Sequence, residues 1–258
     1  MNIDFRVGEL AVHCRNTREE MGKAGAVEAA EMIRQVYCEK GEVNLIFASS
    51  PSQLDFLTAL LEEDVDWGKV NAFHMDEYIG LSIEHKASFG NYLRENFFKK
   101  INLKKIFYLN GLAEDPEKEC DRYSDLLRQY PVDITFAGIG ENGHMAFNDP
   151  GIADFFEPRL VKINHDLDAV CRQQQVNDHW FEKLEEVPDS ALTLTFPALL
   201  HAKQIFITVP GKTKADIVQK CLEGPICLEA PSSVMRVHRD ARLYIDSDSA
   251  AKLSIMQR

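Results

Sequence analysis

The chain has 258 residues, of which 45% are hydrophobic and 27% are charged, and its formal net charge is −12 at pH 7. This composition is typical of a globular protein with one large domain or two small ones. The acidic balance argues against a nucleic-acid or acidic-membrane partner, which would require clustered positive charge, but it allows a locally basic pocket for an anionic small molecule.

The sequence also indicates where the protein works. It has no apolar run of about 18 residues, and residues 1–14 (MNIDFRVGELAVHC) lack the basic-then-apolar layout of a signal peptide. The six cysteines are scattered without a CxxC pair, so we expect reduced core thiols rather than a disulfide framework or a zinc site. We therefore expect a cytoplasmic protein without a membrane partner.

Short apolar runs alternate with amphipathic stretches along the chain. Residues 1–40 are expected to form a helical lead-in, clearest over 25–37 (GAVEAAEMIRQVY). After it the pattern predicts strands and helices in alternation. The expected strands are 43–48, 70–75, 105–109, 132–140, 191–196, 204–209 and 242–246, and the expected helices are 53–63, 89–100, 119–130 and 214–224.

This alternation predicts an α/β fold. Strands rich in Val, Ile and Phe, separated by helices, indicate a three-layer, Rossmann-like, mostly parallel sheet with helices on both faces. Without repeats or a Pro/Gly/Ser-rich linker, we expect a single domain over residues 1–258. Such sheets bind ligands outside the carboxyl ends of their strands, so the loops that follow the strands are the candidate site.

The loop ASSPSQ (48–53) lies between an expected strand and an expected helix. A helix N-terminus provides free amides and a positive dipole end that suit phosphate, and Ser49, Ser50 and Ser52 could add hydroxyl donors. The alternative is that one serine caps the helix while Pro51 shapes the turn.

The loop HMDEYIGL (74–81) carries two adjacent carboxylates, Asp76 and Glu77. Neighbouring side chains of an extended chain point to opposite sides, so we expect at most one to face a pocket. A carboxylate sheltered among Phe73, Met75 and Tyr78 would have a raised pKa and could act as a base near neutral pH. A helix cap or a surface pair is the alternative.

A glycine-rich turn, FAGIGENGHMAFNDP (136–150), carries one imidazole and one carboxylate. Its glycines permit close approach of the backbone to a ligand. His144 can transfer protons near neutral pH, and Asp149 could orient it or stabilise its charged form. A lone histidine is often structural, but the position after a strand's carboxyl end, with Asn142 nearby, favours a functional role.

Two further segments offer cations. Lys212 and Lys214 begin the helix of VPGKTKAD (209–216), where they oppose the helix dipole unless an anion lies between them. Arg172 of CRQQQ (171–175) could complete a phosphate clamp, or it could be a solvated helix charge.

The sequence gives little indication of a cofactor. It has no HExxH, and its eight histidines are dispersed, so we expect no metal. GIGENG (138–143) has the letters of a dinucleotide fingerprint, but it continues into HMAFNDP rather than into a helix, so we expect no dinucleotide.

Taken in order, FHMDEYIGL, FGNYLRENFF, GIGENGHMAFNDP and PGKTKA resemble the glucosamine-6-phosphate deaminase/isomerase family from about residue 40 to the end of the chain. The wider superfamily includes 6-phosphogluconolactonases, whose histidine motif typically continues into a Ser-Leu-Phe-Pro type ending. This chain has AFNDP there and so is more similar to the deaminases.

The resemblance implies both an activity and residue roles. Family members open the ring of an amino-sugar phosphate, move a proton from C2 to C1 and expel ammonia to give fructose 6-phosphate, without a metal or organic cofactor. It implies that Asp76 is the base, that His144 drives ring opening with Asp149 in support, and that Lys214 binds phosphate. Asn142 occupies a position where the family more often has aspartate. The activity classes implied are isomerase and hydrolase.

Two alternatives remain open. A 6-phosphogluconolactone hydrolase would use His144 to activate water and would release no ammonia. A sugar-phosphate sensor of the kind found in bacterial repressors would need a DNA-binding helix-turn-helix, for which the short lead-in and the net charge of −12 offer little basis. Some members of the resembled family are hexamers, so a homo-oligomer is a further expectation.

Overall fold

The computed structural model describes residues 2–257, and its centre is an eight-stranded sheet in the order β1-β2-β11-β10-β7-β3-β4-β6. Its strands pair in parallel from β2 to β6, and β1 is added antiparallel at one edge. A smaller antiparallel sheet has the order β5-β9-β8. The strands are β1 (Ile3–Val7), β2 (Leu10–Arg15), β3 (Val43–Phe47), β4 (Val70–His74), β5 (Asp76–Tyr78), β6 (Lys105–Phe107), β7 (Ile134–Ala137), β8 (Val161–Asn164), β9 (Ala191–Leu194), β10 (Gln204–Val209) and β11 (Ala241–Asp246).

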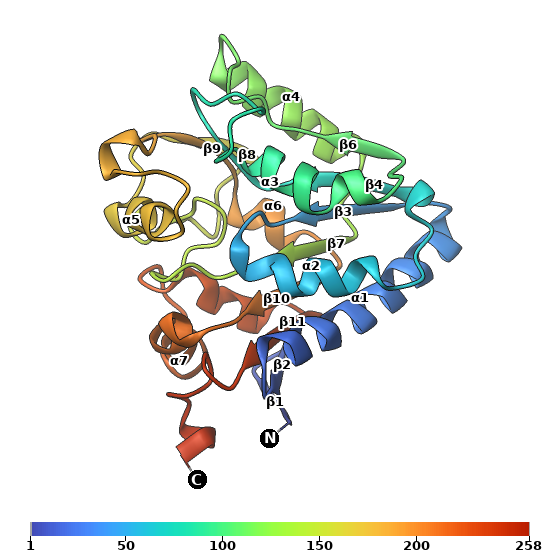
Figure 1. Ribbon diagram of the computed structural model, residues 1–258, viewed down its shortest axis with the longest axis vertical. Helices are drawn as coiled ribbons and strands as arrows, with labels where there is room; N and C mark the ends of the chain where they lie inside the picture. The colour runs from blue at the N-terminus through green and yellow to red at the C-terminus, as the bar shows by residue number, and fades with distance from the viewer. Residues whose placement is uncertain (1, 258) are drawn as a thin grey trace.

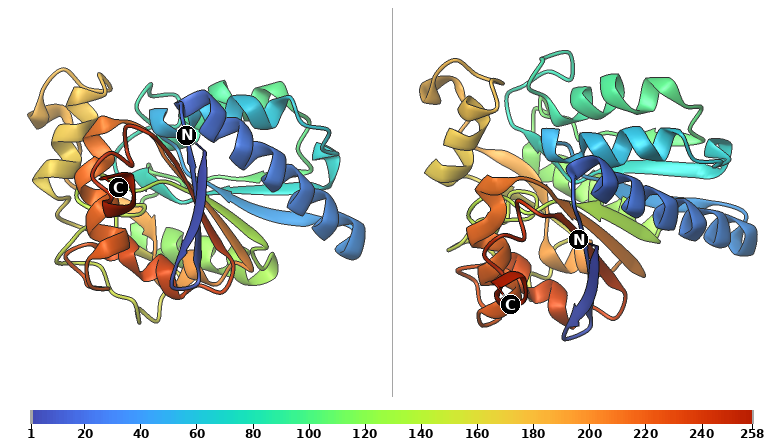
Figure 2. Two further views of the ribbon diagram at one scale, coloured as in Figure 1. Left: turned by 90° about the horizontal axis from the view of Figure 1, so that it is seen from below. Right: turned by 60° about the horizontal axis from the view of Figure 1, so that its bottom comes forward.

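Helices cover both faces of the large sheet (Figure 1, Figure 2). One face is covered by α1, α2 and α3, and the other by α4, α6 and α7, while α5 packs near the small sheet. None of the helices within residues 2–257 combines the length and the apolar character needed to cross a membrane. The helices are α1 (Arg18–Lys40), α2 (Leu54–Leu61), α3 (Phe89–Asn96), α4 (Pro116–Gln129), α5 (Ala169–Asn177), α6 (Phe196–Leu200) and α7 (Ala215–Glu223).

The central strands are apolar on both faces. In β3, Leu45 and Phe47 pack into the cluster that includes α1 to α3, whereas Ile46 packs into the cluster on the opposite face. This alternation follows from the two-residue period of a strand, and it explains why the central strands have continuous hydrophobic sequences. The prediction of a three-layer, mostly parallel α/β sheet is confirmed.

The N-terminal region differs from the helical lead-in expected over residues 1–40. It forms a β-hairpin, β1–β2, and helix α1 begins at Arg18. The half-buried and exposed residues of β1 alternate, which is a strand pattern, and Gly8 makes the turn with φ of +61°. A Cβ atom at Gly8 would lie 2.7 Å from the Arg236 carbonyl oxygen.

The strand expected at 191–196 exists as β9, but it belongs to the small sheet and pairs with β5 and β8. Neither of these three- and four-residue partners was expected as a strand. That the whole chain is one domain stays a prediction.

Strand order places the site. From β3 the sheet continues in one direction through β4 to β6, and in the other through β7 to β10 and β11. The β3–β7 boundary is therefore the point at which the order reverses, where open α/β sheets form their ligand crevice. The loops that follow β3 and β7 flank this point, and β4 ends beside them.

Candidate active site

A cavity that is open to solvent lies at the carboxyl ends of the central strands. The loops that follow β3, β4 and β7 all contribute to its wall, together with residues of α5 and the start of α7. Of the residues predicted from sequence, those that line it are Ser49, Ser50, Ser52, Asp76, His144 and Lys214.

Asp76 is held at the cavity by the small sheet. It is the first residue of β5, directly opposite Thr193 of β9. Its neighbour Glu77 faces away and accepts hydrogen bonds at the start of α3, including 2.6 Å from the Ser88 hydroxyl and 3.0 Å from the Gly90 amide. As the alternation of an extended chain predicts, one carboxylate lines the cavity and the other caps a helix.

The surroundings of Asp76 favour its neutral form. The residue is 8% exposed, and burial, followed by repulsion from Glu77, holds the pKa of Asp76 well above its ordinary value. Burial also raises the pKa of Glu77, although hydrogen bonds from Ser88 and the start of α3 oppose this effect. A carboxyl group with a raised pKa suits proton transfer near neutral pH.

The turn after β7 requires glycine at two places beside His144. A Cβ atom at Gly140 would lie 2.1 to 2.4 Å from three atoms of the His144 ring, so a side chain there would displace the imidazole. Gly143 has φ of +91°, a backbone conformation that favours glycine. Ser232 fixes the same turn, because its amide and its hydroxyl both donate to the Gly143 carbonyl, at 3.0 and 2.8 Å.

His144 is part of a polar network with Asn142 and Asp149. Its Nδ1 atom lies 2.7 Å from Asn142 Oδ1 and 3.3 Å from Asp149 Oδ1. The Asn142 side-chain amide donates to Asp149 Oδ1 at 3.0 Å and to Asp168 Oδ1 at 3.2 Å. Both acceptors near Nδ1 favour a hydrogen on that atom, which leaves Nε2 free to exchange a proton in the cavity.

The network keeps Asp149 ionised despite its burial. Burial alone would raise the pKa of Asp149, but hydrogen bonding to the His144 and Asn142 side chains, charge attraction to His144 and a weak backbone hydrogen bond from Asp168 together lower that pKa. Asp168 also caps α5, since its carboxylate accepts from the amides of Val170 and Cys171. An Asp before a helical run is a sequence signal for an N-cap, but the contact with Asn142 could not be expected from it.

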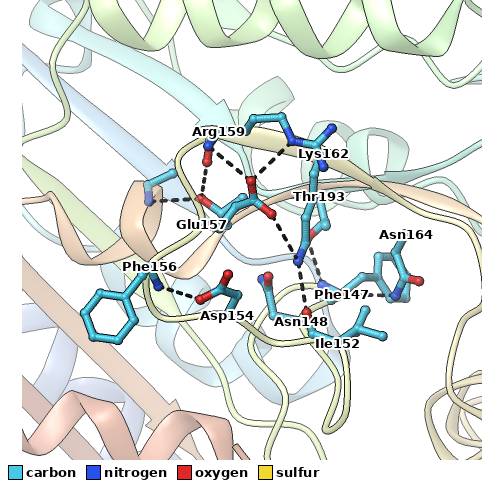
Figure 3. A network of polar contacts seen from close by, with 12 residues as sticks. Phe147, Asn148, Ile152, Asp154, Phe156, Glu157, Arg159, Lys162, Asn164 and Thr193 are labelled. Atoms are coloured by element: carbon cyan, nitrogen blue, oxygen red, sulfur yellow. Dashed lines mark hydrogen bonds and ion pairs between the residues drawn. The ribbon is translucent and has the colours of Figure 1, made fainter.

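Strands β8 and β9 support the chain that follows His144 (Figure 3). The Phe147 amide donates to Thr193 Oγ1 at 3.0 Å, and the Asn164 side chain donates to the Phe147 carbonyl at 3.1 Å. The buried ammonium of Lys162 donates to the Ile152 carbonyl at 3.1 Å. Thr193 therefore contacts the histidine loop directly and pairs with Asp76 through the backbone.

The serine loop offers several hydroxyls to the cavity. Ser50 Oγ and Ser52 Oγ are 2.6 Å apart, and the buried Ser49 Oγ has no hydrogen-bond partner among residues 2–257. A short 3₁₀ turn, Pro51–Gln53, follows Ser50. Gln53 anchors this turn to β10, because its side chain exchanges hydrogen bonds with Thr208.

Lys214 brings a buried cation to the same cavity. It lies at the start of α7 and is 6% exposed, whereas Lys212 is exposed. Burial lowers the pKa of Lys214, while the nearby carboxylates of Glu141 and Asp178 oppose this effect. A buried ammonium group and serine hydroxyls that line the same cavity are suited to bind an anion.

The structure corrects the expectation for Arg172. Its guanidinium donates to the carbonyls of Leu184 and Val187, at 2.9 and 2.8 Å, and it is absent from the cavity wall. The face of α5 that meets the cavity carries Cys171, Gln174 and Gln175 instead. One helical position turns a side chain by about 100°, so sequence could not distinguish the inward residues from Arg172. The sequence analysis did not predict that these three residues and Phe89 line the cavity.

Comparison with known proteins gives a consistent result. Residues 16–244 match the family described as glucosamine-6-phosphate isomerases/6-phosphogluconolactonase. The chain is 33% identical over 231 residues to the glucosamine-6-phosphate deaminase of Listeria monocytogenes (serotype 4a, strain HCC23), covering 89% of this chain and 96% of that protein. It is 32% identical over 227 residues to the corresponding deaminase of Lacticaseibacillus paracasei, covering 88% and 93%.

Solved structures share the architecture. A structure described as a monomeric glucosamine-6-phosphate deaminase superposes with a TM-score of 0.84 at 31% identity, covering 93% of this chain and 98% of that one. The 6-phosphogluconolactonase of Thermotoga maritima superposes with a TM-score of 0.74 at 17% identity, covering 92% and 99%. The second likeness concerns the fold alone.

Proposed function

The chain belongs to the family of glucosamine-6-phosphate isomerases and 6-phosphogluconolactonases, and from that membership we propose that it is a glucosamine-6-phosphate deaminase. The proposed reaction consumes glucosamine 6-phosphate and water and yields fructose 6-phosphate and ammonia. One observation carries the proposal: Asp76, His144 and Lys214, from three separate loops, line one cavity.

In the proposed mechanism His144 acts first. Its Nε2 atom relays a proton between the ring oxygen and O1 of the sugar, which opens the ring. Asn142 and Asp149 hold the Nδ1 side of the imidazole and so fix its orientation. The Asp149 carboxylate also stabilises the ring when it carries a second proton.

Asp76 then moves the proton. C2 of the open-chain sugar is adjacent to an aldehyde, so a positioned carboxylate can remove its proton and deliver one to C1. Loss of the amino group as ammonia and addition of water at C2 complete the conversion to the ketose. None of these steps requires a cofactor.

The phosphate supplies binding energy at a distance from the reacting carbons. We assign it to the buried ammonium of Lys214 and the hydroxyls of Ser49, Ser50 and Ser52, which line the same cavity. Binding at this remote group would orient C1 and C2 toward Asp76 and His144.

The test measures both products. We expect purified protein incubated with glucosamine 6-phosphate to release ammonia and fructose 6-phosphate in equal amounts, while glucose 6-phosphate gives no ammonia. Inactivity toward both glucosamine 6-phosphate and galactosamine 6-phosphate would overturn the proposal. Hydrolysis of 6-phosphogluconolactone without any ammonia release would instead identify the lactonase alternative.

We further propose a cytoplasmic location, in keeping with cysteines that are all free. The solved deaminase relative is described as monomeric, whereas the sequence resemblance suggested a homo-oligomer. Light scattering of the purified protein decides between the two states.

A further inference from the structure

A cysteine thiol lies beside the His144–Asp149 pair. His144, Asp149 and Cys171 each have one potential ligand atom, and these three atoms lie within 4.8 Å of one another. The residues come from the loop after β7 and from α5. Because Cys171 is distant in sequence from His144 and Asp149, no ligand motif connects the three, and the sequence predicted no metal site.

The buried part of this cluster has unused bonding capacity. Asp149 and Cys171 are each 1% exposed. Asp149 Oδ1 accepts from Asn142 and lies near His144, but the buried Asp149 Oδ2 accepts no hydrogen bond of normal length and angle from residues 2–257. A buried carboxylate oxygen without a well-formed hydrogen bond is unusual, and a bound cation would satisfy it.

We propose that His144, Asp149 and Cys171 bind one Zn²⁺ ion in the sugar-free protein. Imidazole nitrogen, carboxylate oxygen and thiolate sulfur are the three ligand types that zinc uses, at distances of about 2.0 to 2.3 Å. Tetrahedral bonds of this length separate ligand atoms by about 3.3 to 3.8 Å. From the present upper limit of 4.8 Å, the ligand atoms therefore need to approach one another by at most about 1.0 to 1.5 Å.

The site differs from a closed structural zinc site. Three protein ligands leave the fourth position of a tetrahedral ion free, and His144 and Cys171 both line the cavity, so this position faces the cavity. On binding, the Cys171 thiol releases its proton to solvent as the Zn–S bond forms. The ion is displaced when a chelator captures it and the thiolate is protonated again.

Zinc binding would block the proposed reaction, and this consequence rests on the proposed function. The ion would engage His144 and Asp149, the residues assigned to ring opening, so the metal-bound protein would not turn over. Zinc and the sugar phosphate would compete for the same cavity. Bound zinc would therefore inhibit the enzyme when zinc is in excess.

The primary experiment measures metal binding without turnover. Zn²⁺ is titrated into the protein against a chromogenic chelator, and Co²⁺ is added separately to observe the absorption of a thiolate-to-cobalt bond. We expect one equivalent of Zn²⁺ to bind and this absorption to appear. In Cys171→Ser and Cys171→Ala, affinity should fall by at least about 10-fold and the absorption should vanish, because loss of a residue that only orients a metal ligand already costs about 10- to 100-fold.

Cys38→Ser is the matched control, because Cys38 is exposed and lies on α1. It should bind Zn²⁺ like the unsubstituted protein. The proposal is overturned if the protein binds no Zn²⁺ at micromolar concentration, or if Cys171 variants bind it undiminished. It is also overturned if the cobalt absorption is lost in Cys38→Ser instead. Near-ultraviolet circular dichroism of each variant distinguishes loss of a ligand from loss of fold.

A second measurement separates this proposal from the proposed function. Ammonia release is followed with and without Zn²⁺, and reversal is tested with EDTA. If the protein releases no ammonia at all, the proposed function fails, whereas the Zn²⁺ and Co²⁺ titrations still test the metal site. If it is active and Zn²⁺ binds through Cys171 without inhibiting, the inhibitory role is wrong.

Discussion

Asp76 lies directly opposite Thr193 in the antiparallel pairing of β5 with β9. This short ladder fixes the strand face on which each of two adjacent carboxylates lies. Asp76 therefore lines the cavity, and Glu77 caps α3. Because Thr193 Oγ1 also accepts a hydrogen bond from the Phe147 amide, the same strand holds the loop that carries His144.

We expect Asp76→Asn to lower kcat by about 10² to 10⁴, the usual contribution of a general base, while KM changes little. Asparagine keeps the shape of the side chain but cannot accept the C2 proton. In the unsubstituted enzyme kcat/KM should rise with pH through the raised pKa of Asp76, so its acidic limb should lie above about pH 4, the value of an ordinary aspartate.

Steady-state ammonia release from pH 5 to 9 measures both effects. Glu77→Gln is the paired control. Since Glu77 caps α3, this substitution should lower the midpoint of thermal unfolding, but it should lower kcat far less than Asp76→Asn does. Near-normal kcat in Asp76→Asn would exclude Asp76 as the base.

Asp76→Asn should also stabilise the fold at neutral pH. The pKa of Asp76 is raised in the folded state, so its contribution to the free energy of unfolding is complete below the unfolded pKa of about 4. It is lost as pH rises through the folded-state pKa. Asp76→Asn, which stays neutral, should therefore unfold at a higher temperature than the unsubstituted protein at about pH 8, and the difference should shrink at about pH 4.

Thermal unfolding followed by circular dichroism at both pH values tests this prediction. A difference that is largest at acidic pH would contradict the raised pKa of Asp76. Activity and stability are thus expected to change in opposite directions at one residue, as is common for residues whose burial serves catalysis.

Lys214 and Lys212 form a natural pair for testing phosphate binding. Lys214→Met should raise KM by about 10- to 100-fold, since hydrogen bonds to charged groups contribute about 1.5 to 3 kcal/mol. Lys212→Met should leave KM within about twofold, because Lys212 is exposed and outside the cavity wall. Inorganic phosphate should inhibit the unsubstituted enzyme and the Lys212 variant more strongly than the Lys214 variant. Equal KM values in the two variants would remove Lys214 from the phosphate site.

Asp149→Asn should lower kcat by at least about 10-fold, because the imidazole loses the charge beside Nδ1. The pKa of Asp149 is lowered, so the residue is a carboxylate throughout the neutral range, and the loss should be nearly constant from pH 6 to 9. Asp154→Asn, in the same loop but exposed, is the control and should retain activity. A loss that disappears at high pH would show that Asp149 acts in another way.

The sequence predicted the parts of the site that depend on short-range patterns. Asp76 and His144 each follow a buried strand, and parallel strands bring their carboxyl ends to one edge. Lysines at a helix start conflict with the dipole unless an anion is present, which pointed to Lys212 and Lys214 together, and the family resemblance then selected Lys214.

Other parts depend on tertiary contacts that no local pattern encodes. Arg172 was assigned to the cavity because of its charge, but a turn of about 100° per residue on α5 brings Cys171, Gln174 and Gln175 inward instead. Asp168 was expected nowhere in the site, although it links Asn142 to α5. The small sheet was missed because its strands are short and pair across long separations in sequence.

The N-terminal hairpin has a consequence for solubility. Strand β1 covers the free backbone amides and carbonyls of β2, and one face of this edge strand carries the exposed charges of Asp4 and Arg6. Such charges deter another chain from extending the sheet. A protein shortened past Val7 would expose the bare rim of β2, and its copies could then join strand to strand into aggregates.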